Sequence, residues 1–293
     1  MRKQLVKSVE KILSEDTNTV LLLGDIGVFG FRNSLKKHPN RAYNIGILEQ
    51  STISLSAGMS KTGLIPFVHT IAPFLVERAF EQLKIDFGYQ NLNGNFISVG
   101  ASYDYASLGC THHCPGDVNI LYAIPNMEIL LPGTSKELDS LINECYDNGK
   151  PTYYRLSEHE NDFSNDVKVG RANLIKKGSD ATIICFGNSL SSVIESTKNM
   201  DVTILYYTSV RPFDGDLLLD NFNQNIIIVE PFYEGSVNFE VTKTLKDKKY
   251  SLYNIGVPRE FIMKYGKKEE VDKFVGLDQK SINENINKIL CRI

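Results

Sequence analysis

The chain has 293 residues, a formal net charge of -3, 42 % hydrophobic residues and 23 % charged residues. This length predicts two domains, the slight excess of acidic residues argues against a nucleic-acid partner, and no apolar run reaches the roughly 20 residues of a membrane span. The N-terminus predicts an amphipathic helix instead of an export signal, so we expect the five cysteines to be reduced thiols in a cytoplasmic protein.

The first half of the chain alternates helical and strand-like patterns. In chain order we expect a helix over 3–14, strands over 19–25 and 41–47, a helix over 50–60, a strand over 65–71, a long helix over 74–88, strands over 95–101 and 127–133, a helix over 135–148 and a strand over 151–157. Apolar strands that alternate with helices favour a mainly parallel sheet covered on both faces.

A polar stretch over 157–171 has no periodicity and predicts a linker. The alternation then resumes, with strands expected over 180–189, 201–207, 225–231 and 250–258, and helices over 191–199, 236–245 and 282–290. The predicted fold class is therefore α/β, with two open, mainly parallel three-layer sheets. We expect one domain over 1–160 and a second over 161–293.

Two polar features follow predicted strands. The loop LLLGDIGVFG has its glycines in a G-x-x-G-x-x-G spacing, which is not the dinucleotide pattern, but Asp25 ends a strand and is expected at a ligand crevice. The loop CTHHC (110–114) permits a zinc site, a plain polar loop or a site histidine. We favour the histidine, because zinc sites normally combine two separated clusters.

Glu49 lies between the apolar run IGIL and a predicted helix of small residues. One interpretation is a carboxylate in the first turn of that helix, where the helix dipole favours negative charge. The other is a carboxyl buried among apolar side chains, where burial raises the pKa and lets the group hold a proton near neutral pH.

Several longer motifs resemble a known family. The run NIGILEQSTISLSAGMSKTGLIPFVHTIAPFLVERAFEQL resembles the pyrimidine-binding domain of transketolases, a family that includes deoxyxylulose-phosphate synthases and the β subunits of 2-oxoacid dehydrogenases. GCTHHCPGD and IPNMEILLPGTSKEL match further motifs of that domain. DATIICFGNS, VTILYYTSVRPFD and IIIVEPFYEGS are similar to the transketolase C-terminal domain, so the resemblance covers nearly the whole chain.

The resemblance implies thiamine diphosphate as the cofactor. Glu49 matches the acid that shares a proton with the pyrimidine ring, and it is both a catalytic and a cofactor-binding candidate. Phe74 matches the aromatic residue that stacks on that ring. The resemblance also places Asp25 and Ile47 beside the cofactor.

The resemblance likewise assigns substrate contacts. His112 matches the histidine of the family's T-H motif, which reaches the substrate and exchanges a proton or hydrogen bond with a developing alkoxide. His113 and Arg2 are further substrate-binding candidates. Three positions depart from the family pattern, because Leu108, Gly100 and Glu158 replace polar or cationic substrate contacts. These changes disfavour a terminal phosphate, so we expect an unusual or unphosphorylated sugar or keto substrate.

Transketolases are about twice as long as this chain, and their diphosphate-binding half has no counterpart here. We assign no metal ligand to this chain and expect Mg²⁺ or Ca²⁺ to be bound mainly by a partner subunit. The partner would be an N-terminal, diphosphate-binding transketolase subunit in an α₂β₂ heterotetramer, with no nucleic acid and no membrane involved.

The leading interpretation is the C-terminal subunit of a transketolase-like transferase of carbohydrate metabolism. It would move a two-carbon ketol unit and be active only with its partner. The alternatives are the β subunit of a 2-oxoacid dehydrogenase and a non-catalytic assembly subunit.

Overall fold

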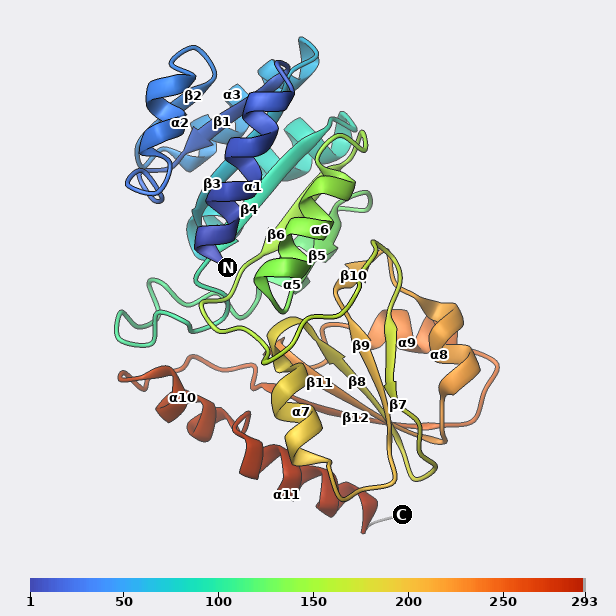
Figure 1. The fold of residues 1–293 in the computed structure, drawn as a ribbon. Coiled ribbons are helices and arrows are strands. Elements are labelled where there is room, and N and C mark those ends of the chain that lie inside the picture. The colour runs from blue at the N-terminus through green and yellow to red at the C-terminus, as the bar shows by residue number, and fades with distance from the viewer. Residues whose placement is uncertain (292–293) are drawn as a thin grey trace.

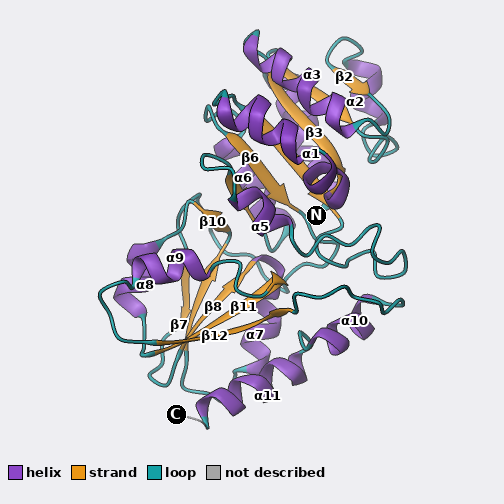
Figure 2. Cartoon of the chain, turned by 180° about the vertical axis from the view of Figure 1, so that it is seen from behind, coloured by secondary structure: helices purple, strands orange, loops and turns teal. Residues whose placement is uncertain are grey.

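The computed structural model describes residues 1–291 and contains two β-sheets with helices on both faces (Figures 1 and 2). The first sheet and its helices occupy the upper part of Figure 1, and the second sheet occupies the lower part. Within the described residues, no helix is long and apolar enough to cross a membrane. The α/β fold class with two mainly parallel sheets is confirmed.

The first sheet has seven strands in the order β10-β5-β6-β4-β3-β1-β2. Their bounds are β1 (Thr19–Leu23), β2 (Ala42–Asn44), β3 (Ile65–Ile71), β4 (Gly94–Val99), β5 (Glu128–Leu130), β6 (Pro151–Arg155) and β10 (Ser209–Arg211). All neighbours are parallel except β10, which pairs antiparallel with β5. The strands β1 and β6 are buried along their whole length, as expected for central parallel strands covered by helices on both faces.

Helices cover this sheet as two layers. They are α1 (Arg2–Glu15), α2 (Arg32–Lys37), α3 (Glu49–Lys61), α5 (Asp117–Tyr122) and α6 (Ser135–Cys145). The helices α1 and α6 pack together on one face, and α3 packs on β3 on the other (Figure 1). The amphipathic helix expected at the N-terminus is present, with Leu5, Val9 and Leu13 buried on its inner side.

The single long helix expected over 74–88 is wrong in its geometry. The segment consists of a π-helical turn, η1 (Phe74–Arg78), a short α4 (Phe80–Gln82) and a second π-helical stretch, η2 (Leu83–Tyr89). Such π-helical turns are rare and occur frequently at functional sites.

The second sheet has five strands in the order β12-β11-β8-β9-β7. Their bounds are β7 (Asn173–Lys176), β8 (Thr182–Phe186), β9 (Thr203–Tyr207), β11 (Asn225–Tyr233) and β12 (Ser251–Val257). Its helices are η3 (Gly187–Ser189), α7 (Leu190–Ser196), α8 (Gly215–Asn221), α9 (Asn238–Thr244), α10 (Lys268–Val275) and α11 (Gln279–Leu290). The helices α7 and α11 pack together, and α8 packs with α9, so this sheet also lies between two helical layers.

The two sheets share structure. The strand β10 follows β9 of the second sheet in the chain but pairs with β5 of the first. One cluster of buried apolar side chains also includes residues of both sheets. It joins Val68 and Phe96, from β3 and β4, to Phe186 and Phe232, from β8 and β11. The division into domains at residues 160 and 161 remains a proposal.

The strand order creates a crevice at the carboxyl end of the first sheet. From β1 the chain passes through α2 to β2 on one side, whereas β3 leads on to β4 on the other. In an open α/β sheet, ligands bind outside the carboxyl ends of the strands where the chain changes direction in this way. Here that position lies between the ends of β1 and β3.

Candidate functional site

Glu49 is the first residue of α3, and its side chain is only 2 % exposed. The Thr70 hydroxyl donates to Oε1 at 3.2 Å, and the Arg78 guanidinium donates to Oε2 at 2.6 Å. Glu49 is therefore both buried and in the first turn of a helix, so each interpretation of the sequence describes part of its position. Its surroundings are not purely apolar, because a hydroxyl and a cation meet the two carboxyl oxygens.

The backbone of Gly24 packs closely against Thr70 beside Glu49, so no side chain fits at this position. A Cβ atom at Gly24 would lie 2.9 Å from the Thr70 side chain and 3.5 Å from Glu49 Oε1. The next residue, Asp25, has φ of 63°, a left-handed conformation that Asp adopts more readily than most residues. Its carboxylate accepts from the Asn44 amide at 3.1 Å, which fixes this loop at the end of β1.

Two aromatic rings lie next to the Glu49 pocket. The Arg78 guanidinium carbon lies 4.3 Å from the centre of the Phe74 ring, so the cation covers one face of that ring. The His112 ring contacts Phe74 edge-on, with centroids 5.4 Å apart. The structure thus brings Phe74 and His112 together, and Arg78 connects Phe74 to Glu49.

The remaining candidates lie around this centre at different depths. Ile47 is 64 % exposed in the loop before α3. His113 is 6 % exposed and lines a separate cavity of about 90 Å³ together with Glu77 and Tyr233. Burial lowers the pKa of His113 and raises the pKa of Glu77. His112 and His113 therefore occupy different surroundings although they are adjacent in sequence.

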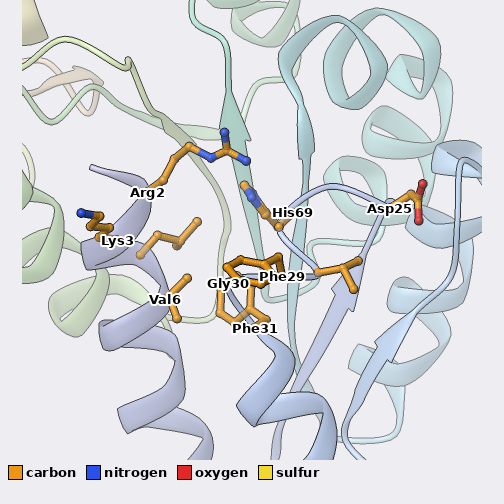
Figure 3. Close-up of a pocket in the computed structure, with 11 residues that line it drawn as sticks. Arg2, Lys3, Val6, Asp25, Phe29, Gly30, Phe31 and His69 are labelled. Carbon is orange, nitrogen blue, oxygen red and sulfur yellow. The ribbon is translucent and has the colours of Figure 1, made fainter.

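Arg2 lies at a larger cavity, of about 370 Å³, between α1 and the loop after β1 (Figure 3). Its guanidinium extends over the cavity toward His69, whereas Lys3 points away (Figure 3). The lining residues are Arg2, Lys3, Leu5, Val6, Asp25, Gly27, Val28, Phe29, Gly30, Phe31 and His69. Glu158 lies 3.7 Å from the Arg2 guanidinium, so the cation at this cavity has a carboxylate partner.

A buried ion pair anchors the loop that carries His112. Arg155 donates to Asp117 Oδ2 at 2.7 Å and to the Ser102 hydroxyl at 2.6 Å. The Arg155 guanidinium also donates to the carbonyl of Pro231, in the second sheet, at 3.3 Å. The backbone of Ser102 pairs with that of Cys114, so this network closes both ends of the loop. It also joins the loop to both sheets.

Sequence reasoning missed two side chains that contact Glu49. Arg78 follows Phe74 by four residues, a spacing that places side chains on one face of a helix and that would have indicated a cation beside the ring. Thr70 alternates with His69 along β3, so the two point to opposite faces of the sheet. Among residues 1–291, no group of three or more His, Cys, Asp or Glu side chains is placed to hold a metal ion.

Comparisons with known proteins match both halves of the chain. The family described as "Transketolase, pyrimidine binding domain" matches residues 1–162, and "Transketolase, C-terminal domain" matches residues 170–282. An uncharacterized 33.6 kDa protein in the fasciation locus of Rhodococcoides fascians is 34 % identical, over 95 % of this chain and 91 % of that protein. A subunit of the apulose-4-phosphate transketolase of Phocaeicola vulgatus is 27 % identical, over 96 % of this chain and 94 % of that protein.

A solved structure named "Split gene transketolase, inactive beta4 tetramer" superposes with a TM-score of 0.86. It is 24 % identical and covers 99 % of this chain and 97 % of that one, so it supports the same fold. Together with the two family matches, which span both sheets, these findings show that the chain belongs to the transketolase family and contains its pyrimidine-binding and C-terminal domains.

Proposed function

We propose that this chain is the smaller subunit of a split, thiamine-diphosphate-dependent transketolase-like enzyme that transfers a two-carbon ketol unit. The observation that carries the proposal is the buried carboxyl of Glu49 beside Phe74 and His112, within the stretch that matches the pyrimidine-binding domain. A relative of similar length is named as one subunit of a transketolase, which supports the same role here.

The residues present fit the pyrimidine half of the cofactor. The Glu49 carboxyl offers a buried acceptor, and Phe74 offers a ring face for stacking. The close approach of Gly24 to Thr70 holds the residue that orients this carboxyl. When bound, thiamine diphosphate supplies the electron sink for breaking and forming the carbon–carbon bond. Asp25, in the loop after β1, and Ile47, in the loop before α3, are proposed to flank the pyrimidine ring of the cofactor.

Each catalytic candidate has a separate task. Glu49 would hold or release a proton at its carboxyl oxygen, with the Thr70 hydroxyl fixing its orientation at 3.2 Å. His112, whose Nδ1 lies 2.9 Å from the Thr111 hydroxyl, would present its other nitrogen to the substrate oxygen. A hydrogen bond there stabilises negative charge as it develops on that oxygen.

The diphosphate end needs a partner. The described part of the chain has no cluster that would hold Mg²⁺ or Ca²⁺, so we propose that a second, diphosphate-binding subunit supplies those ligands. A neighbouring gene for a chain with Gly-Asp-Gly and a downstream Asn would support this proposal. An α₂β₂ assembly and a cytoplasmic location stay predictions.

The cavity at Arg2 supports an unusual or unphosphorylated substrate. Phe29 is 81 % exposed at its rim, and Val28 and Phe31 add further apolar lining. The carboxylate of Glu158 offsets the charge of Arg2, which weakens this position as a phosphate site. His113, which lines a separate cavity, is retained only as a proposed substrate contact.

Two alternatives make different predictions. A β subunit of a 2-oxoacid dehydrogenase would give lipoamide-dependent activity with its partner. A non-catalytic assembly subunit would leave the assembled enzyme indifferent to substitutions at Glu49. The buried Glu49 carboxyl, held by the Thr70 hydroxyl in the same region as the paired rings of Phe74 and His112, favours the catalytic proposal over the latter.

The decisive experiment is Glu49→Gln in the chain assembled with its diphosphate-binding partner. Because an amide cannot hold the proton, we expect ketol transfer to fall by about 100-fold or more, a loss typical of removing a proton-transferring group. Glu81→Gln, at an exposed position in the same region, is the matched control and should leave turnover unchanged. Full activity of the Glu49 variant would rule out the proposed function.

A further inference from the structure

The guanidinium of Arg78 occupies the space between the Phe74 ring and the Glu49 carboxyl, a space called here the pyrimidine slot. Its central carbon lies 4.3 Å from the centre of the Phe74 ring, and one of its nitrogens donates to Glu49 Oε2 at 2.6 Å. A flat, charged group therefore stacks on the aromatic ring and hydrogen-bonds the buried carboxyl at the same time.

An aminopyrimidine ring would need these same two contacts. It is also flat, it would stack on Phe74 at about the separation of stacked rings, and it would hydrogen-bond the Glu49 carboxyl. A guanidinium 4.3 Å from the ring leaves no room for a second ring on that face. The arginine and the pyrimidine therefore exclude each other from the pyrimidine slot.

We propose that Arg78 fills the pyrimidine slot in the cofactor-free chain and moves out when the cofactor binds. This inference rests on the proposed function, in which the slot receives thiamine diphosphate. Arg78 gives the buried Glu49 carboxyl a charged partner before cofactor and partner subunit arrive, which avoids an unpaired charge in the interior. Cofactor binding then has to displace an internal ion pair, and this lowers the apparent affinity for the cofactor.

The surroundings permit this exchange. The Arg78 side chain is 39 % exposed, so it has a path to solvent, whereas Glu49 is enclosed and stays in place. Thr70 remains bonded to Oε1, so the carboxyl keeps its orientation when Arg78 leaves Oε2. Arg78 also ends the π-helical turn that begins at Phe74, so the ring and the cation are held by the same short element.

The test uses the purified chain and the pyrimidine half of thiamine, 4-amino-5-hydroxymethyl-2-methylpyrimidine, as the probe, with binding measured by ligand-observed NMR. Arg78→Met removes the competing cation, and we expect it to bind the probe about tenfold more tightly or better, as expected when a charged hydrogen bond no longer competes. Lys84→Met is the matched control. Lys84 is an exposed cation over the Phe80 ring and should leave probe binding unchanged.

The outcomes separate the two proposals. Equal binding by the wild-type chain and by Arg78→Met would overturn the role of Arg78 but leave the cofactor site intact. No binding to any variant at millimolar probe would overturn both. Arg78→Lys keeps the charge but has no planar group to stack on Phe74, so this variant should also bind the probe more tightly than the wild type. It serves as the test if Arg78→Met does not fold.

A second readout does not involve the probe. We expect Arg78→Met to lower the midpoint of thermal unfolding, because Glu49 loses its charged partner, and Glu49→Gln in the same chain to reverse that loss. If the losses of the two single variants simply add in the double variant, the ion pair has no role in the cofactor-free chain and the inference is wrong.

Discussion

A buried histidine makes the stability of this protein sensitive to pH. His69 lies in β3 with its ring packed edge-on to Phe31, and its Nδ1 lies 2.9 Å from the carbonyl oxygen of Ile97. Burial is the main reason that the pKa of His69 is lowered from 6.5 to about 4. The folded chain therefore keeps this ring neutral at pH values where the unfolded chain protonates it.

The sign and size of the effect follow from this difference. Between pH 6.5 and 4 the unfolded chain binds a proton at His69 and the folded chain does not, so the free energy of unfolding falls as the pH falls. The difference between 6.5 and about 4 corresponds to a loss of about 3 kcal/mol once the pH reaches 4. Above pH 6.5 the histidine has no further effect.

Glu230 opposes this trend. Burial raises the pKa of the Glu230 carboxyl from 4.5 to about 7, although the backbone N–H groups of Gly235 and Val237 donate to it. Between pH 4.5 and 7 the folded chain holds a proton that the unfolded chain has lost. Acidification through this range therefore raises the free energy of unfolding by about 3 kcal/mol, and the two effects nearly cancel in the wild type.

Urea unfolding at pH 7.5 and 4.5 measures each contribution separately. His69→Asn should gain about 3 kcal/mol relative to the wild type as the pH falls, and Glu230→Gln should lose a similar amount. His159→Asn, at an exposed histidine, is the control and should follow the wild type. If the wild-type and His69→Asn curves stay parallel between the two pH values, the reasoning about His69 is refuted.

Two further predictions concern the ion pairs. Arg155→Met should lower the free energy of unfolding by about 3–5 kcal/mol, because it leaves the buried Asp117 carboxylate unpaired. Adding Asp117→Asn to that variant should recover part of the loss, as measured by chemical unfolding. If the losses of the two single variants simply add, the two side chains do not act as a buried pair. Glu158→Arg in the assembled enzyme should raise the ratio of kcat/KM for phosphorylated over unphosphorylated acceptors by about tenfold, because it replaces a carboxylate beside Arg2 with a second cation. An unchanged ratio would show that the cavity at Arg2 does not determine which acceptor is used.

The sequence predicted the parallel strands well, because buried apolar runs such as Thr19–Leu23 have a strong signal. It missed β7 and β10, which are the antiparallel edge strands of the two sheets. They have four and three residues, and neither shows a continuous buried run, so no period is long enough to detect. It also predicted one helix where π-helical turns occur, because the same residues suit either geometry.

For the site, the resemblance proposed Glu49, Phe74 and His112. In the structure His112 contacts Phe74, and Arg78 links Phe74 to Glu49. The chemistry around Glu49 was not predictable from neighbouring residues, because Thr70 and Arg78 come from two other elements that only the fold brings to α3. The pairing of Arg2 with Glu158 was hidden for the same reason, since more than 150 residues separate the two positions.

The short strand β10 has a consequence for synthesis of the chain on the ribosome. The edge of the first sheet at β5 stays open until Ser209–Arg211 has emerged, long after the other strands of that sheet are available. An exposed strand edge invites pairing with other nascent chains. A truncated gene product that stops in the linker after β6 should therefore aggregate, even though it contains every proposed catalytic residue.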